Sequence, residues 1–454
     1  MPYIVRDKGT GSDRDSGLEA VNMAVTKGEL EVVSRACELE DISDVLIKKI
    51  PSFNVSSDLI AYASPDSTYA VTKHLLDSAK KSVLIGIYDF TASYMRDILL
   101  NLMARGVKVS LMLDLDGVKG EQEVFDKLGS LGAEVVPAPS CASDRISYFA
   151  SSHEKVIVID GTWVMVQSGN YSNNSIPLNE KDGGDPQKFV KGNRDMGIAV
   201  RSPALAKFFS KVLRKDMSLE LSAPEAVAKM PVELPMLVEA APKLIPKKLF
   251  KSKKFSTSKP IKVLPVLSPD NYMDVVPDFL RSARESIIIE QQYIKSSQKE
   301  VSKLLGAIKD VMSENNVDVK IILGKIFSNK DIPKEKKNLE NLRSKYGLKL
   351  GTNVRYIDTK RFVHCHNKLI VIDEKKALVS SQNWSDSAVS KNREAGLILE
   401  HSGIAKYYAA IFSSDWETAL KKLPAVGGEP ESLAASRVKK GGFIEVNYGD
   451  YAEV

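Results

Sequence analysis

Two His-Lys pairs with identical downstream spacing are the residues of this sequence best suited to chemistry. In each copy a Lys follows the His by two residues, and an Asp, a Ser and an Asn follow it by seven, fifteen and seventeen. The two sets are His153, Lys155, Asp160, Ser168 and Asn170, and His366, Lys368, Asp373, Ser381 and Asn383. A single His-x-Lys pair is usually solvated or structural. Because the chain has only five His, two matching sets exclude coincidence.

The chemistry that these groups fit is cleavage of a phosphodiester. Lys155 and Lys368 supply two fixed cations for the anionic oxygens. One neutral imidazole can attack phosphorus while the other, protonated, donates to the leaving alkoxide. The neutral donors expected to face the phosphate oxygens are Asn170, Asn383, Ser168 and Ser381. Since each copy holds half of the set, the copies must face each other across a pseudo-two-fold interface.

Carboxylates accompany both copies. Asn193-Arg-Asp195 parallels Asn392-Arg-Glu394, and each precedes an apolar strand. We expect these carboxylates to orient the histidines and to push their pKa values apart. Asp160 and Asp373 lie seven residues beyond the His, too far along a strand to reach phosphorus. We predict structural roles for them, paired with backbone or a basic group.

The duplicated His-x-Lys-x4-Asp pattern resembles the phospholipase D superfamily, over about Asp58 to Leu420. The resemblance implies a covalent phosphohistidine formed without metal or other cofactor, with His153 as nucleophile and His366 as acid. It also implies catalytic roles for Lys155, Lys368, Asn170, Asn383, Asp195 and Glu394. The family usually has Glu where Asp195 stands, which questions the reach of this shorter side chain. It usually has Gly at Gln167 and Ser380, so these side chains are expected to narrow the pocket.

Strand and helix patterns alternate through the first half of the chain. Apolar runs predict strands at 59–63, 82–88, 107–115, 134–137, 163–166 and 195–200, and helical stretches at 68–80, 94–105, 121–131 and 204–217. Tyr88, Phe90, Tyr293 and Trp384 fall at strand ends, where they either line a core or stack on a substrate. This alternation predicts an α/β lobe with a mixed or parallel sheet.

The second half repeats the first. Ser268-Pro269-Asp270 matches Ser64-Pro65-Asp66 at an offset of 204, and the motif histidines are offset by 213. We predict an α/β fold of two tandem, pseudo-two-fold-related α/β/α sandwich lobes that share one active site at their interface. The predicted parts are a helical N-terminal preface (1–57), a first lobe (58–223), a Pro/Lys-rich linker (224–260), a second lobe (261–424) and a C-terminal tail (425–454).

Composition constrains the partners and the cellular compartment of the protein less tightly than the motifs constrain its chemistry. The net charge of +6 and pI near 8.8 favour anionic partners without choosing between nucleic acid and membrane. Three widely spaced Cys predict no disulfide framework, which fits a reducing, cytoplasmic setting. We find no signal-peptide core or transmembrane run and expect a monomer, with peripheral membrane contact as an option. His364-Cys365-His366 lacks a second cluster, so no metal site is expected.

Several functions share these residues. The leading hypothesis is hydrolysis of a phospholipid head-group phosphodiester, because two fused lobes can differ and so suit an asymmetric substrate. A nuclease is the first alternative, since Asn383-Trp-Ser and Asn392-Arg-Glu394 also resemble that branch of the family and the Lys run at 243–259 suits a phosphate backbone. A phosphatidyltransferase differs only in the acceptor. Complete motifs in both copies argue against a non-enzymatic binding protein.

Overall fold

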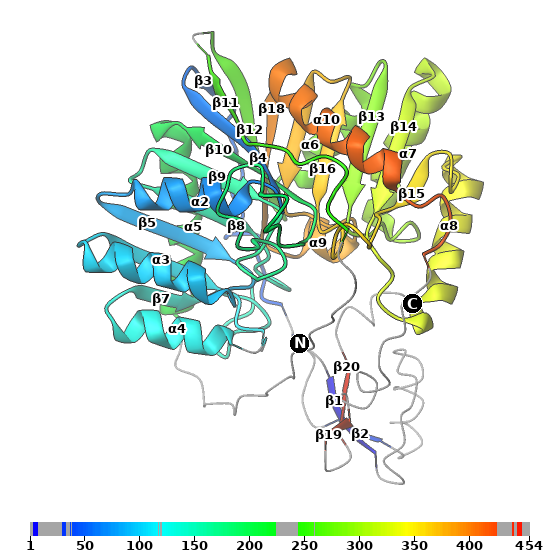
Figure 1. Cartoon of the computed structure of the whole chain (residues 1–454). Helices are drawn as coiled ribbons and strands as arrows, with labels where there is room; N and C mark the ends of the chain where they lie inside the picture. Colours follow the sequence, from blue (N-terminus) through cyan, green and yellow to red (C-terminus); the bar gives the residue numbers. More distant parts are fainter. Residues whose placement is uncertain are drawn as a thin grey trace.

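The fold is taken from a computed structural model of the whole chain (Figure 1). It describes Cys37 and residues 39–116, 118, 120–223, 244–257 and 259–424, together with the backbone of four short strands. Those strands, β1 (Tyr3–Asp7), β2 (Leu30–Val32), β19 (Val438–Lys439) and β20 (Phe443–Val446), form a small sheet in the order β19-β20-β1-β2. The prediction of a helical preface is therefore wrong at Leu30–Val32, which forms a strand. Most of the preface before residue 39, most of the tail and most of the linker lie outside the described residues.

The first lobe contains an eight-stranded mixed sheet in the order β11-β4-β10-β9-β8-β5-β6-β7. β5, β6 and β7 run parallel, as expected for strands joined by helices, and the other neighbours are antiparallel. The strand bounds are β4 (Asp58–Ser64), β5 (Ser82–Ile87), β6 (Lys108–Leu113), β7 (Glu134–Pro137), β8 (Lys155–Ile159), β9 (Trp163–Gln167), β10 (Asp195–Arg201) and β11 (Lys253–Ser256).

The second lobe repeats this sheet in the order β15-β14-β13-β16-β17-β18-β12-β3. Its strands are β3 (Phe53–Val55), β12 (Ile261–Ser268), β13 (Ser286–Gln291), β14 (Asp318–Leu323), β15 (Val354–Tyr356), β16 (Lys368–Ile372), β17 (Lys376–Ser380) and β18 (Glu394–Glu400). Both copies of the Ser-Pro-Asp turn contain a cis Ser-Pro peptide bond. Two tandem lobes of mixed α/β structure, predicted from the repeat, are confirmed.

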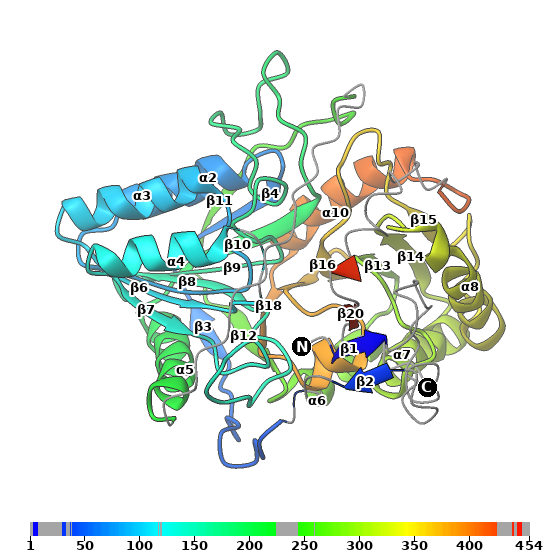
Figure 2. The ribbon, with the colours of Figure 1, turned by 90° about the horizontal axis from the view of Figure 1, so that it is seen from below.

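Helices cover both faces of each sheet. In Figure 1, and from below in Figure 2, the blue-to-cyan helices of the first lobe and the yellow-green helices of the second lie on opposite sides of the molecule. The first-lobe helices are α2 (Thr68–Asp77), α3 (Ser93–Ala104), α4 (Glu121–Ser130) and α5 (Pro203–Leu221). The second-lobe helices are α6 (Tyr272–Arg281), α7 (Lys299–Asn315), α8 (Ile332–Tyr346) after a 3-10 turn (Asn329–Asp331), α9 (Asp386–Ser390) and α10 (Ser402–Thr418).

One hydrophobic core crosses the boundary between the lobes. It contains α5 side chains such as Phe209, α10 side chains such as Tyr408, and residues of both sheets. The hydroxyl of Tyr408 donates to the carbonyl of Gly197 in the other lobe at 2.7 Å. Each outer helix layer has its own core. The inner faces of the two sheets are therefore held together by apolar burial, which is the largest favourable term in packing.

The lobes also exchange edge strands. β3 precedes the first lobe in sequence but pairs with β12, and β11 precedes the second lobe but pairs with β4. Val55 lies opposite Ile261, and Phe255 opposite Leu59. Each sheet is therefore completed by a strand from the neighbouring part of the chain.

Two buried arginines join the lobes in symmetry-related positions. Arg194 pairs with Asp66 of its own lobe at 3.3 Å and with Asp415 of the second lobe at 2.7 Å. Arg393 pairs with Asp270 of its own lobe and, at 2.9 Å, with Asp216 of the first. All these side chains are at most 4% exposed, so each charge depends on its partners for compensation.

A disulfide joins Cys37 to Cys141, which the cysteine count did not predict. Folding brings together two residues separated by 104 positions, because Glu40 lies against the loop that contains Cys141 and donates to Ser147. The expectation of no disulfide is wrong, and with it the argument from cysteine for a reducing compartment. Among the described residues, no helix has the length and apolar character needed to cross a bilayer.

Candidate active site

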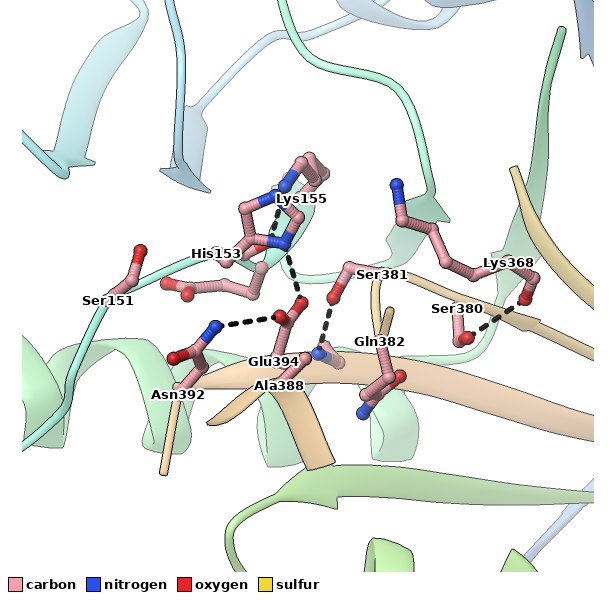
Figure 3. A network of polar contacts seen from close by, with 12 residues as sticks. Ser151, His153, Lys155, Lys368, Ser380, Ser381, Gln382, Ala388, Asn392 and Glu394 are labelled. Carbon is pink, nitrogen blue, oxygen red and sulfur yellow. Dashed lines mark hydrogen bonds and ion pairs between the residues drawn. The ribbon is translucent and has the colours of Figure 1, made fainter. Parts of the chain in front are cut away.

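The two motif histidines meet where the lobes face each other. The imidazole rings of His153 and His366 lie 6.4 Å apart between centroids. Each is held by the carboxylate of the opposite lobe: His153 Nδ1 lies 2.9 Å from Glu394, and His366 Nδ1 lies 3.0 Å from Asp195 (Figure 3 shows the first pair). Asp195 is ionised and only accepts, so Nδ1 of His366 carries hydrogen and its Nε2 is not engaged by the carboxylate; Glu394 orients His153 in the same way when it is ionised. The shorter Asp195 therefore does reach its histidine.

The two histidine-carboxylate pairs differ in charge. Burial first, then Lys155 and Lys368, hold the pKa of His153 well below its ordinary value. Burial and Lys368 lower the pKa of His366 to about 4, against the opposing effect of Asp195. Burial raises the pKa of Asp195, but His366 and Lys368 outweigh this effect and keep that pKa below its usual range. Burial raises the pKa of Glu394 to about 7. His366 consequently has the more firmly ionised partner.

Lys155 and Lys368 are fully buried on the first residue of β8 and β16. Each ammonium donates to the carbonyl of its own motif histidine, and Lys368 also lies 3.4 Å from the Gln292 amide oxygen. Burial lowers the pKa of Lys155 to about 7 and that of Lys368 to about 8. Two cations under this desolvation favour an anionic ligand beside them.

The serines were expected to face phosphate, but they face the carboxylates instead. Ser168 donates to Asp195 at 2.7 Å, and its oxygen accepts from the Met196 backbone. The Ser381 oxygen accepts from the Ala395 backbone beside Glu394. Each hydroxyl is drawn to the start of the adjacent strand, β10 or β18, because it satisfies buried groups there. Contact of Ser168 and Ser381 with phosphate stays a prediction.

Asn170 and Asn383 each have an unpaired side-chain atom in the site. Asn170 and Asn383 are 7% and 6% exposed, and the side-chain oxygen of each has no hydrogen-bond partner among the described residues. They follow the ends of β9 and β17, beside the histidines of their own motifs. The unpaired atom in each is thus an acceptor, and Asn383 also forms a side-chain hydrogen bond with Tyr293.

The motif aspartates Asp160 and Asp373 lie at the far end of the motif strands. Asp160 accepts from the backbone N–H groups of Lys80, Lys81 and Ser82 at 2.7–2.9 Å. Asp373 accepts in the same way from residues 284–286 at 2.8–3.2 Å. Both occupy turns with φ near +51° and +52°. Each carboxylate fixes the start of the neighbouring strand, β5 or β13.

Gln167 and Ser380 point their polar atoms into the protein. Gln167 accepts from the Tyr62 hydroxyl at 3.0 Å and donates to the Gly169 carbonyl at 2.7 Å. Ser380 donates to the Lys368 carbonyl at 3.0 Å (Figure 3). These contacts use their hydrogen-bonding capacity within the sheets.

A group of carboxylates beside His153 was missed by sequence reasoning. We call it the acidic wall: Asp89, Asp114, Asp116 and Glu121. Tyr88 links it to the site, because its ring lies 4.6 Å from that of His153 and 5.1 Å from the Lys155 ammonium, and its hydroxyl donates to Asp116. Burial and then mutual repulsion raise the pKa of Asp114 to about 7 and that of Glu121 to about 10. Asp89, Asp114 and Asp116 closely follow the ends of β5 and β6, and this position was the feature of the sequence that could have identified them.

The second lobe has no such wall at the corresponding positions. β14 corresponds to β6 at an offset of 210 and the motif histidines correspond at 213, so Gly324 matches Asp114 and His364 matches Ser151. A side chain at Gly324 would overlap His364, whose Nδ1 accepts from the Lys325 backbone at 2.9 Å. The duplicated lobes therefore present different walls to one site, carboxylates on one side and imidazole with Lys325 on the other.

A family model described as "Cardiolipin synthase, PLD-like domain" matches residues 72–217 and 276–416, one match for each lobe. The chain belongs to the phospholipase D superfamily. The two matched ranges include both histidines, both lysines and both orienting carboxylates. A search of curated protein sequences finds no match.

Solved structures of this phospholipase D-like fold include distant relatives. Phosphatidylserine synthase of Haemophilus influenzae Rd KW20 is 14% identical, with a TM-score of 0.55 over 86% of this chain and 94% of that one. Nuc of Salmonella typhimurium, a phospholipase D family member, is 21% identical over 36% of this chain and 94% of that one, with a TM-score of 0.29. Polyphosphate kinase of Porphyromonas gingivalis is 11% identical over 84% and 54%, with a TM-score of 0.48. At these identities the likeness concerns the fold.

Proposed function

We propose that this protein cleaves the head-group phosphodiester of a phospholipid through a phosphohistidine, without a metal ion. The observation that carries the proposal is the cross-lobe site: two histidines on opposite-lobe carboxylates, with two buried ammonium groups beside them. The ammonium groups neutralise the phosphoryl oxygens, and the side-chain N–H groups of Asn170 and Asn383 donate hydrogen bonds to them.

The unequal carboxylates support a division of labour between the histidines. His153, whose partner Glu394 has a pKa of about 7, stays neutral and attacks phosphorus with Nε2. His366, beside the ionised Asp195, accepts a proton more readily and donates it to the leaving oxygen. His366 then removes a proton from the incoming water, which displaces His153 from phosphorus.

The acidic wall supports a lipid over a nucleic acid. A polynucleotide places a phosphate on each side of the scissile one. Asp89 of the wall, whose pKa burial raises to about 6, is largely ionised at neutral pH and repels that charge, whereas Glu121, with a pKa of about 10, is protonated. A phospholipid head group brings a single phosphodiester to the two lysines. Transfer to an alcohol instead of water is the second candidate, supported by the limited access to the site: His153 and His366 are only 8% and 9% exposed.

The test is an assay in excess EDTA with phosphatidylcholine, phosphatidylethanolamine, cardiolipin and single- and double-stranded nucleic acids. His153→Asn and His366→Asn run in parallel, with and without added glycerol. We expect head-group release by the wild type and a loss of at least about a hundredfold in both variants. With an activated leaving group, His366→Asn should still accumulate the phosphoenzyme and His153→Asn should not. Glycerol adducts would assign transfer, and cleavage of nucleic acid alone would overturn the proposal.

A further inference from the structure

Exposed apolar side chains gather at one end of the molecule. Nine large apolar side chains of the described residues are prominently exposed: Leu39, Val118, Leu131, Leu178, Val190, Leu221, Leu244, Ile245 and Phe327. Scattered singly over a surface, such residues need no explanation. Their distribution over the two ends of the sheets is what matters here.

The catalytic histidines define the site end of the sheets, where β5 and β14 finish and β8, β10 and β16 begin. Val118 and Phe327 follow β6 and β14 at this end, and Leu178 and Val190 lie in the loop that enters β10. Leu221 ends α5, next to Glu220, which accepts from Ser143 in the loop leading to His153. Leu39 adjoins Glu40, which donates to Ser147 of that same loop. Leu131, between α4 and β7, is the one exception.

Three segments at this end are joined by hydrogen bonds, and we call them the docking rim: residues 177–191, 244–251 and 358–361. Leu244 donates its N–H to Lys360, Arg361 donates to the Ile245 carbonyl at 2.7 Å, and the Lys191 ammonium donates to Thr359 at 2.6 Å. The apolar side chains of the rim are 37–50% exposed: Leu178, Val190, Leu244 and Ile245. Contiguous exposed apolar residues of this kind mark an interaction surface.

Cationic side chains surround these apolar ones. Residues 244–251 contain Lys247, Lys248 and Lys251 and no carboxylate, and Lys360 and Arg361 adjoin them. Lysine can extend along an apolar contact while its ammonium stays at a charged surface. Across the three segments, eight Lys or Arg side chains outnumber four Asp or Glu, although Lys247 already pairs with Glu417 and Arg361 with Asp358. Apolar side chains among an excess of cations match the interface of a bilayer that contains anionic lipids.

The rim connects to the catalytic centre through short backbone contacts. Val363 donates to the Gly192 carbonyl, Arg194 to His364 and His366 to Arg194, at 2.8–3.0 Å. These contacts lead from the rim to His366 and to Asp195, its carboxylate partner. A bilayer that touches the rim would therefore lie at the mouth of the site.

We propose that the docking rim binds the surface of an anionic phospholipid bilayer and delivers lipid to the site from it. The choice of a bilayer as partner rests on the lipid substrate proposed above. Leu244 and Ile245 insert among the head groups, and the rim cations neutralise lipid phosphates. Binding consequently weakens as salt is added.

The experiment measures partition of the full chain onto vesicles of phosphatidylcholine with and without phosphatidylglycerol. Leu244→Ser combined with Ile245→Ser is compared with Leu131→Ser, a matched control that is 53% exposed at the opposite end. We expect the double variant to lose about tenfold or more in partition onto anionic vesicles, and the control to match the wild type. Equal partition of wild type and double variant, or an equal loss in the control, would overturn the proposal.

Activity on a short-chain phospholipid dissolved as monomers keeps the two proposals apart. The double variant should cleave it at the wild-type rate, because the catalytic groups are untouched. If the wild type fails on this substrate in the head-group assay, the proposed function fails, while the partition measurement still decides the docking rim. A loss of both partition and monomer cleavage in the double variant would assign Leu244 and Ile245 to folding instead and contradict the rim.

Discussion

At the residue scale, the site depends on carboxylates donated across the lobe boundary. Asp195 is the informative one, because it is a methylene shorter than the residue usual in the family yet lies 3.0 Å from His366. Gly169 makes room for it: a Cβ there would lie 3.1 Å from the Asp195 carboxyl carbon. A side chain at position 169 would therefore crowd the carboxylate that holds His366.

Replacing Asp195 by Asn should move the alkaline limb of the pH profile of kcat/KM to lower pH. The anion favours the protonated form of His366, so its removal lowers the pKa of the general acid, which then loses its proton at lower pH. We expect a loss of about a hundredfold at neutral pH. Glu394→Gln is the comparison, because a partner already near half protonation has less charge to lose. An unshifted limb in Asp195→Asn would reject His366 as the acid.

At the scale of elements, the sequence predicted most helices and strands to within a few residues, since hydrophobic periodicity marks buried faces. It missed β3 and β11, because Phe53–Val55 and Lys253–Ser256 are short edge strands, the latter largely polar, with little alternation to detect. It also missed the carboxylate contacts of Ser168 and the Cys37–Cys141 bond, since both depend on how distant segments meet. The motif residues themselves were predictable, because the duplication repeats them at the same spacing.

The turn aspartates should matter for stability more than for chemistry. Asp160→Ala removes the acceptor of three backbone N–H groups and places Ala at a φ of 51°, for which we expect a loss of about 3 kcal/mol in the free energy of unfolding. Asp160→Asn tolerates the φ and should lose about 1 kcal/mol. Urea titration measures both, with Asp97→Ala at an exposed ion pair as control.

The pH dependence of this effect has a definite sign. Although partial burial raises it, the backbone donors lower the pKa of Asp160 below its ordinary value of 3.8. The stabilisation is therefore present above that value and is lost as pH falls through the lower folded pKa. The stability difference between wild type and Asp160→Asn should shrink in acid. A difference that grows in acid would contradict the assignment.

At the scale of the whole molecule, the two lobes are one folding unit. A shared core, two exchanged edge strands and two buried arginine clusters cross the boundary, and the two histidine-carboxylate pairs do so as well. Neither lobe holds a complete site.

Replacing Arg393 by Met should destabilise the whole chain. The change leaves Asp216 and Asp270 buried without their cation, for which we expect a loss of about 3–5 kcal/mol in the free energy of unfolding. Lys247→Met, at an ion pair whose side chains are more than half exposed, should cost less than about 1 kcal/mol. Urea unfolding should remain a single transition by fluorescence and circular dichroism. Two separate transitions in Arg393→Met would show that the lobes unfold independently.

The exchanged strands also set the order in which the protein can fold while it is synthesised on the ribosome. β3 leaves the exit tunnel early, but its partner β12 is synthesised about two hundred residues later. Val55 of β3 must therefore wait for Ile261 of β12 before it can pair. The first sheet likewise waits for β11 before its edge is covered. A nascent chain that stops between the lobes therefore exposes one unfinished sheet edge and an unpaired segment, both open to wrong partners. Once the second lobe has been synthesised, β3 and the edge of the first sheet can both pair, and the two histidine-carboxylate pairs form at the same stage.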